Sequence, residues 1–441
     1  MKYLSKYLEE NADLELDIHS ESDLDIIVVI PAHDEDEATV LECLRSLEIA
    51  AGKSRCNCLV SLLLNYKNHS SDEIKQKAHS LFHRLRQLDF NLELQVFLSE
   101  LKTKKAGVGV ARKKLMDSAL SYFNKAGKNG LIVNLDADTL VEDNYFNVIY
   151  DFFQVNSSVS AASIYFEHRY TNHHEAYVDA INAYELHLRY FINMQRLLAL
   201  PYAFQTIGSA MAVRAHDYAR VGGMPKRQAG EDFYFIHKFT KLYELGEINE
   251  TCVHPSNRES NRVPFGTGKA VLDLLKFNSV YKSYNWKSFE ILQGWLDKFL
   301  SLQLSTYNQS QNLKDLQIDD EHLKAFMQNI GALEEIRSII KRSKNFDSFL
   351  KSFFQWFDAF SLMKYLHHMR DAGYEDVDAL DCSRYLFDRL GINPAEDLKA
   401  CLSQLQKLDR SSEYSDQWRA ALISRLSSIS ASRSTHQARR E

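Results

Sequence analysis

The stretch GLIVNLDADTLVEDNYF, residues 130–146, decides the fold. An apolar run from Leu131 to Leu135 ends at two aspartates, Asp136 and Asp138. Such a run predicts a strand buried on both faces, as in parallel sheets. Side chains two residues apart on a strand point the same way. Both carboxylates are therefore expected to project from one face where the strand ends.

Three strand-like runs precede this one, at residues 26–30, 58–64 and 92–98, and Pro31 closes the first. Apolar residues at helical spacing predict helices near residues 40–47, 75–88 and 109–123. Strands that alternate with helices predict an α/β fold with a mainly parallel sheet. Because ligands bind at the carboxyl ends of such strands, residues 31–35, Asn65 and the two aspartates are expected at one edge.

The character of the sequence changes near residue 269, where Gly and Pro become rare and apolar residues fall at helical spacing. This pattern predicts an all-α C-terminal region after the α/β domain. The expected organisation is an acidic lead-in with a loose helix (1–24), an α/β domain (25–268), a helical domain (269–426) and a disordered tail (427–441).

Composition excludes several classes of protein. The formal net charge of −6 argues against a general nucleic-acid binder, which needs a basic face. Six scattered cysteines imply no disulfide framework. The N-terminus lacks the apolar core of a signal peptide, and no apolar run is long enough to cross a membrane. A cytoplasmic protein is expected, with peripheral membrane association left open.

The two aspartates admit two interpretations. Converging carboxylates hold Mg²⁺ or Mn²⁺ and leave positions for phosphate oxygens and water. A metal there would stabilise a nucleotide diphosphate as a leaving group. Alternatively, Asp136 or Asp138 caps a helix that starts within TLVEDNYFNVIYDFF. The spacing alone leaves both interpretations open.

A glycine-bearing loop, KKAGVGVARKKL at residues 104–115, opens the third predicted helix. Small residues at a helix N-terminus permit close approach of a phosphate or a sugar. The loop lacks the third glycine of a dinucleotide-binding motif and the Lys-Ser/Thr end of a P-loop. By itself it is typical of a plain loop.

Two polar segments lie further along the chain. Glu231 and Asp232 precede an aromatic helical run, where one of them could accept a proton from an attacking hydroxyl. Acidic residues are also favoured in the first turn of any helix. The segment at residues 251–268 carries His254, Arg258 and Arg262, and its arginines could hold a diphosphate or simply face solvent.

Four motifs occur in an order that is found in a known protein family. They are VVIPAHDE (28–35), AGVGVARKKL (106–115), IVNLDADT (132–139) and VGGMPKRQAGED (221–232). Together they resemble the family 2 glycosyltransferases of GT-A fold, over roughly residues 25 to 268. The resemblance implies transfer of a sugar, with inversion, from a nucleotide-diphosphate sugar to a glycan or other hydroxyl acceptor. It implies Mn²⁺ or Mg²⁺ as cofactor. The helical C-terminal region matches no family that we can name.

The resemblance assigns roles by position. Asp138 and Asp136 match the metal-binding Asp-x-Asp, with Asp136 also near the donor, and Asp232 matches the catalytic base with Glu231 beside it. The residues that it places around the nucleotide are Pro31, Ala32, Glu35, Asn65 and Arg112. Gly208 and Arg214 fit the stretch that borders the donor sugar and the acceptor. The assignment of Arg258 and Arg262 to phosphate rests on their charge and not on the resemblance.

The chain departs from the family pattern at several positions. His33 and Asp34 replace Tyr-Asn, Lys113 replaces the Asn of the "ARN" signature, and Asn65 is not acidic. GT-A enzymes sometimes use a later histidine as a metal ligand, which makes His254 a candidate. The membrane channel and Gln-x-x-Arg-Trp motif of processive members are missing, so transfer of single sugars is expected.

Two other functions compete. VNLDADTL also resembles the first motif of haloacid-dehalogenase phosphatases, in which Asp136 would be a nucleophile. That family normally begins near this motif, whereas about 130 residues precede it here. A non-catalytic domain that binds a nucleotide sugar or a glycan is the second alternative, although both acidic pairs are retained.

Overall fold

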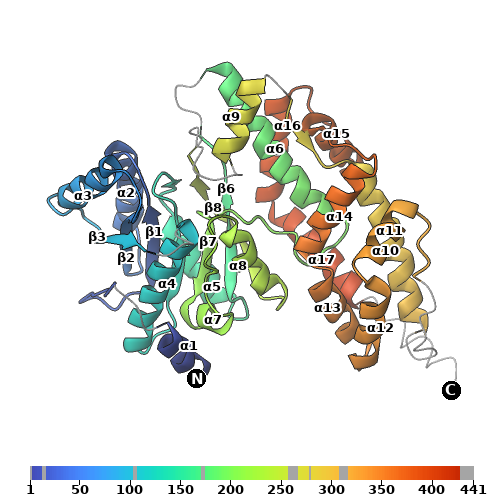
Figure 1. Ribbon diagram of the computed structural model, residues 1–441, viewed down its shortest axis with the longest axis horizontal. Helices are drawn as coiled ribbons and strands as arrows, with labels where there is room; N and C mark the ends of the chain where they lie inside the picture. The colour runs from blue at the N-terminus through green and yellow to red at the C-terminus, as the bar shows by residue number, and fades with distance from the viewer. Residues whose placement is uncertain are drawn as a thin grey trace. The chain divides into compact units, whose positions relative to one another are not determined.

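The structure, a computed structural model, describes residues 2–11, 16–102, 107–169, 174–256, 267–277, 280–306 and 316–427. It contains two compact units. The first comprises Met1–His173 and Phe204–Leu272, and the second comprises His174–Ala203 and Asp273–Glu441. The sequence analysis assigned all of residues 174–203 to the α/β domain, but in the structure they belong to the helical unit. Figure 1 shows α6 (Glu175–Leu197), in green, among helices drawn in orange and red.

The first unit contains a mixed sheet in the order β3-β2-β1-β4-β7-β6-β8-β5. Strands β3, β2, β1 and β4 run parallel, and so do β6 and β8. Strand β7 is antiparallel to both of its neighbours, and β5 is antiparallel to β8. The predicted α/β fold with a helical C-terminal region is confirmed, although the reversed strands were not predicted. The strands are β1 (Ile26–Ala32), β2 (Cys58–Lys67), β3 (Glu93–Leu101), β4 (Leu131–Asn134), β5 (Leu140–Val141), β6 (Ala161–Phe166), β7 (Met211–Arg214) and β8 (Leu245–His254).

Strand β1 shows why the sheet forms. All seven of its residues are buried, because helices cover both faces of the parallel strands. Ile27 and Val29 join a hydrophobic cluster with Leu115 and Ala119 of α4. The helices of this unit are α1 (Lys2–Glu10), α2 (Glu37–Gly52), α3 (Asp72–Leu85), α4 (Val108–Lys125), α5 (Tyr145–Val155), α7 (Ala215–Arg220) and α8 (Glu231–Thr240), and α9 (Thr267–Phe277) spans the division between the units.

The N-terminal helix α1 is more firmly packed than a loose lead-in. Leu4 and Tyr7 are buried in the same hydrophobic cluster. The hydroxyl of Tyr7 donates to Asp117 at 2.7 Å and accepts from Lys113 at 2.6 Å. Lys113 also bonds Asp117 at 2.9 Å. Lys113 therefore serves to anchor α1.

The second unit is helical. Its helices are α6, α10 (Trp286–Thr306), α11 (Glu321–Asn329), α12 (Ala332–Arg342), α13 (Phe346–Trp356), α14 (Ala359–Asp371), α15 (Ala379–Leu390), α16 (Leu398–Arg410) and α17 (Ser412–Ser427), with a short ladder of β9 (Lys282–Ser283) and β10 (Val377–Asp378). No helix in the described part of the chain combines the length and apolar character that a membrane crossing requires.

A buried ionic network joins α6 to α16. Asp409 of α16 pairs with Arg189 at 2.7 Å and with Arg196 at 3.0 Å. It also accepts from the amide of Asn193 at 3.0 Å, and Glu185 pairs with Arg189 at 2.7 Å. The four α6 residues are spaced by three and four, so they share one face of the helix. This face of α6 meets a partner more than 200 residues further along the chain, and the sequence did not show that α6 belongs to the helical unit.

We expect Asp409→Ala to lower the free energy of unfolding of the helical unit by roughly 3–5 kcal/mol, the usual cost of removing one partner of a buried ion pair. The variant would leave the two arginines buried without this carboxylate. The measurement is urea unfolding of the full chain followed by tryptophan fluorescence. All four tryptophans lie in the second unit, so the signal reports on that unit.

The matched control is Asp388→Ala on α15, because Asp388 is exposed. Its loss should change the midpoint little. If both substitutions lowered the free energy of unfolding equally, the stabilising role proposed for the ionic network would be contradicted.

Candidate active site

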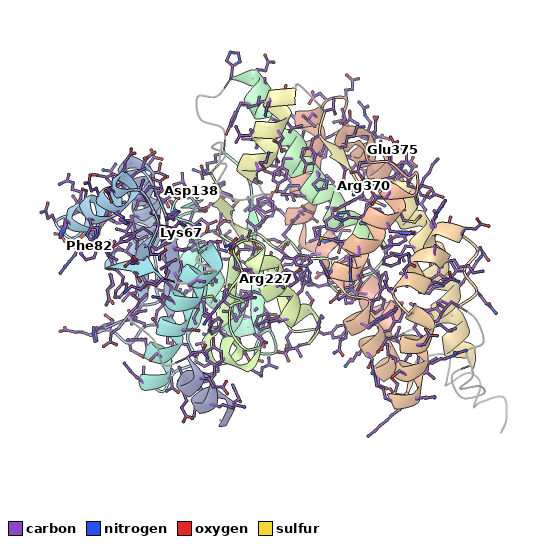
Figure 2. All side chains as sticks on the ribbon, viewed as in Figure 1. Lys67, Phe82, Asp138, Arg227, Arg370 and Glu375 are labelled. Carbon is purple, nitrogen blue, oxygen red and sulfur yellow. The ribbon has the colours of Figure 1, made fainter. Side chains whose placement is uncertain are left out.

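The two aspartates lie beyond the carboxyl end of β4, on the side of the sheet where β2 ends at Lys67 (Figure 2). The backbone N–H of Thr139 donates to the carbonyl of Asp136 at 3.1 Å and closes a turn there. Asp136 and Asp138 are half-buried, whereas Ala137 between them is buried. The turn thus presents both carboxylates at the edge predicted from the sequence.

The helix-cap interpretation of these aspartates is wrong. The next helix, α5, begins at Tyr145, and its N-cap residue is Asn144. The short strand β5 lies between Asp138 and that helix. Neither aspartate caps a helix, so their place at the sheet edge needs another explanation.

Arg112 of α4 joins the two acidic motifs. Its side chain is 3% exposed, and its guanidinium pairs with Asp136 and, at 2.5 Å, with Glu231. Burial disfavours the charged guanidinium, but Asp136, Glu231 and Asp232 outweigh this effect and raise the pKa of Arg112. Arg112 thereby holds Asp136 together with Glu231, a residue 119 positions from the arginine in sequence.

Gly208 packs directly against this guanidinium. A Cβ at position 208 would lie 2.6 Å from Nη2 and 2.9 Å from Cζ of Arg112, so a larger residue would displace the arginine. Gly107 and Gly109, in the loop before α4, also lie against other parts of the chain, in their case the segment Pro225–Gln228. A Cβ at Gly109 would lie 2.5 Å from the carbonyl oxygen of Arg227. The glycine loop thus permits close approach of the segment that leads to Glu231.

Gly230, which adopts a left-handed conformation with φ +70°, directly precedes α8, and Asp232 is the second residue of that helix. Its Oδ1 accepts from the backbone N–H of Phe233 at 2.7 Å. Burial and the neighbouring Glu231 raise the pKa of Asp232 to about 7, against the opposing charge of Arg112. A carboxylate with such a pKa is suited to accepting a proton near neutral pH.

Cys43 of α2 shows that both aspartates reach the same region. Its thiol lies 3.7 Å from the carbonyl oxygen of Asp136. Burial, followed by the charges of Asp138 and Asp136, raises the pKa of Cys43. The charges of both aspartates thus act on the same buried thiol.

The ends of β1 and β2 are fastened by Asn65. Its side-chain amide donates to the backbone carbonyl of Ala32 at 2.9 Å. The backbone carbonyl oxygen of Asn65 lies 2.9 Å from Nδ1 of His33. Pro31 is part of β1 rather than its stop, since it pairs with Leu63. Glu35 is buried in the loop that follows. Asn65 and His33, two of the departures from the family pattern, thus shape the expected nucleotide site.

Arg214 was expected near the acceptor, but the structure places it elsewhere. It pairs with Leu131 at the amino end of β4, whereas Asp136 follows the carboxyl end. Its guanidinium donates to the carbonyl of Phe153 at 2.6 Å and to that of Val159 at 2.9 Å. We therefore correct this assignment, because these carbonyls occupy the guanidinium at the end of α5. Arg258 and Arg262 lie outside the described residues.

His254 ends strand β8 and pairs with Leu140 of β5. Its ring nitrogen Nδ1 lies 3.0 Å from the carbonyl oxygen of Glu167. Within the described part of the chain it belongs to a potential metal-binding group with Glu142 and Cys252. Sequence reasoning missed these two partners, although the alternation Cys-x-His on one strand was a signal.

No protein-family model matches the chain, and no curated protein sequence does. The chain is structurally similar to solved glycosyltransferases. One is TarS from S. aureus in complex with UDP-GlcNAc, at 13% identity over 85% of this chain and 94% of that chain, with a TM-score of 0.37. Another is the mannosyltransferase PcManGT from Pyrobaculum calidifontis in complex with GDP-Man and Mn²⁺, at 12% identity over 97% and 93%, with a TM-score of 0.37.

We expect Arg112→Met to raise the pKa of Asp232 above about 7, because the guanidinium charge lowers it in the native protein. The same change should cost roughly 3–5 kcal/mol of stability, since Glu231 would remain buried without its cation. Carboxyl ¹³C NMR titration measures the pKa, and the signal missing from Asp232→Asn assigns it.

Arg45→Met provides the control, because Arg45 is an exposed arginine of α2. It should leave the titration unchanged. If Arg112→Met left the Asp232 titration where it is, the electrostatic role of Arg112 would be refuted.

Proposed function

We propose that the protein is a metal-dependent, inverting glycosyltransferase of GT-A type that moves a single sugar from a nucleotide-diphosphate sugar to an acceptor hydroxyl. One observation carries the proposal. Arg112 holds Asp136 of the Asp-x-Asp segment and Glu231 of the Glu-Asp pair together at the carboxyl edge of the sheet. That edge is where α/β sheets bind ligands.

Asp232 is assigned as the general base. Its neighbour Glu231 is 3% exposed on the side chain and is paired with Arg112, which makes it a positioning residue. Asp232 is half-buried, and its pKa of about 7 lets it take a proton from an acceptor hydroxyl as that oxygen attacks the anomeric carbon. The nucleoside diphosphate leaves from the opposite face of the sugar, which accounts for inversion.

The donor set at the end of β4 fits a hard cation. Asp136 and Asp138 offer carboxylate oxygens, the ligands that Mn²⁺ and Mg²⁺ take in sites that also bind phosphates. Asp138 is assigned as the direct ligand, and Asp136, which is paired with Arg112, as its partner. When bound, such a cation would offset the charge of the diphosphate.

The remaining residues are assigned to the donor. The ends of β1 and β2, with Pro31, Ala32, Glu35 and Asn65, would frame the nucleotide, and the Asn65 bond to the Ala32 carbonyl keeps these ends together. Gly208 would border the donor sugar, and its lack of a side chain lets the Arg112 guanidinium lie against the backbone there.

The rate of transfer should rise with pH and level off above about 7, because Asp232 must lose its proton before it can act as a base. The measurement is release of nucleoside diphosphate from UDP-, GDP- and dTDP-sugars with a panel of hydroxyl acceptors. Asp232→Asn should lower kcat by about 100-fold or more while the donor affinity stays nearly unchanged. Loss of donor binding in this variant would disprove the assignment of the base.

Metal dependence is tested separately. In a thermal-shift screen, a nucleotide sugar with Mn²⁺ should stabilise the protein more than either alone, because a ligand that binds the folded state raises its stability. Asp138→Asn should abolish the part that needs Mn²⁺. Asp143→Asn is the control, because Asp143 is an exposed aspartate five residues further along. Hydrolysis of a phosphomonoester that is lost in Asp136→Asn, without any nucleotide release, would instead establish the phosphatase alternative.

A further inference from the structure

A second group of potential metal ligands lies on the β5–β8 ladder. One ligand atom from each of Glu142, Cys252 and His254 lies within 4.8 Å of the other two. Cys252 is fully buried and His254 is 6% exposed, whereas Glu142 is half-buried. These residues differ in chemistry from the carboxylates at the end of β4.

Strand geometry explains why the three side chains converge. Leu140 pairs with His254 and Val141 with Val253 in antiparallel register. The ladder extends one residue further, since the N–H of Glu142 donates to the carbonyl of Cys252 at 3.3 Å. Opposite residues of such a ladder share a face, as do residues two apart on one strand. Glu142, Cys252 and His254 therefore project to the same side.

We propose that Glu142, Cys252 and His254 form a Zn²⁺ site that is distinct from the carboxylate site of Asp136 and Asp138. A thiolate, an imidazole and a carboxylate are the ligands that Zn²⁺ takes in proteins, whereas Mg²⁺ and Mn²⁺ favour oxygen alone. Cys252 binds as the thiolate, so its proton is released to solvent on binding. Three protein ligands leave a fourth position for water.

The orientation of His254 suits this role. Its Nδ1 lies 3.0 Å from the Glu167 carbonyl oxygen, and an Nδ1–H donated there leaves Nε2 with the lone pair that binds a metal. A backbone carbonyl is a common second partner of metal-binding histidines because it fixes the tautomer and the ring. Cys252 Sγ lies 3.8 Å from Nδ1 of the same ring, so the ring turns to bring Nε2 to a shared ion.

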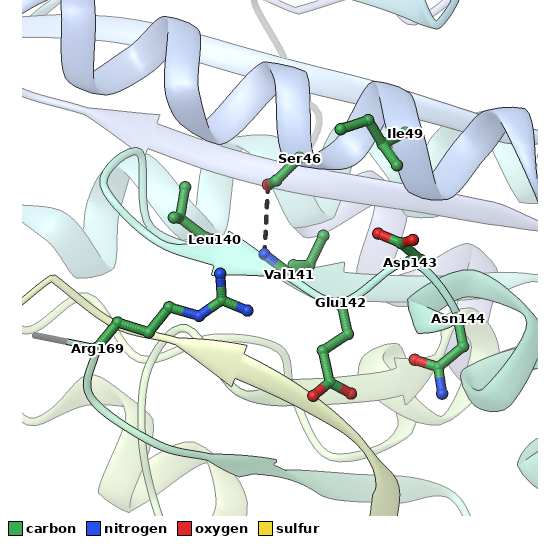
Figure 3. Close-up of a pocket in the computed structure, with 8 residues that line it drawn as sticks. All are labelled: Ser46, Ile49, Leu140, Val141, Glu142, Asp143, Asn144 and Arg169. Atoms are coloured by element: carbon green, nitrogen blue, oxygen red, sulfur yellow. Dashed lines mark hydrogen bonds between the residues drawn. The ribbon is translucent and has the colours of Figure 1, made fainter. Parts of the chain in front are cut away.

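A pocket lies beside Glu142, whereas Cys252 and His254 do not line it. Glu142 lines an open pocket of about 460 Å³ together with Ser46, Leu140 and Arg169 (Figure 3). Bonds of about 2.0–2.3 Å to zinc hold ligand atoms closer together than 4.8 Å, so the group must contract on binding. Glu142 is long and half-buried, which makes it the ligand best able to move.

Zn²⁺ at this position would fasten β5 to β8. Strand β5 begins two residues after Asp138, so the ion would steady the turn that carries the proposed catalytic metal ligand. The proposal assigns His254 to this site rather than to the cation of Asp138. It does not depend on glycosyl transfer, because both readouts below are measured without donor or acceptor.

The first experiment titrates the full chain with Co²⁺ in place of Zn²⁺ and records absorption. Thiolate ligation should produce a charge-transfer band in the near ultraviolet that Zn²⁺ removes stoichiometrically. Cys252→Ser should abolish the band, and Glu142→Gln should weaken Co²⁺ affinity by about 10-fold or more, as loss of a ligand costs at least as much as loss of an outer partner. Glu142→Gln keeps the test valid if Cys252→Ser misfolds, because Glu142 is not fully buried and its substitution should leave the fold intact.

Two controls separate this site from others. The Cys56→Ser/Cys58→Ser variant removes another close pair of thiols, 3.6 Å apart, and should keep the band. Asp138→Asn should also keep it. A band that survives Cys252→Ser, or that disappears with Cys56 and Cys58 or with Asp138, would overturn the proposal. So would the lack of any band, or a Zn²⁺-induced rise in melting temperature that Cys252→Ser retains.

Discussion

The buried guanidinium of Arg112 is the constraint on which the candidate site depends. This guanidinium is almost completely buried, so the cost of removing its charge from water must be offset by the carboxylates that pair with it. That requirement brings Asp136 at the end of β4 and Glu231 at the start of α8 to the same cation. It also fixes Gly208 as a residue without a side chain. One arginine thus turns two distant acidic motifs into a single site.

The same arrangement separates two carboxylates that are adjacent in sequence. Glu231 pairs directly with Arg112, whereas Asp232 accepts a backbone N–H and is held near two other acidic groups. Its pKa is raised because burial and Glu231 oppose its charge more than Arg112 favours it. An acidic pair that could merely have complemented a helix dipole is therefore divided into a positioning residue and a candidate base.

The sequence predicted the strands up to β4 and the edge where the site lies, because parallel strands are long apolar runs with polar ends. It did not predict the strands from β5 to β8, whose pairing depends on contacts distant in sequence. It misplaced α6, whose face toward α16 carries Glu185, Arg189 and Asn193, because Asp409, the partner of this face, lies 216 residues from Asn193 in the chain. Arg214 was misassigned for a related reason, since motif order carries no information on which end of a strand a side chain occupies.

Two kinds of ligand chemistry follow from one stretch of chain. Asp136 and Asp138 lie in the turn after β4 and offer only oxygen, while the ladder that begins at Leu140 brings a carboxylate to a thiol and an imidazole. Hard cations prefer the first set and Zn²⁺ the second. Because a ladder fixes side chains more rigidly than a turn, an ion held between β5 and β8 would restrict the turn without competing for its carboxylates. Asp136 and Asp138 in the turn, and Glu142 with its partners on β8, therefore favour two separate ions over one shared site.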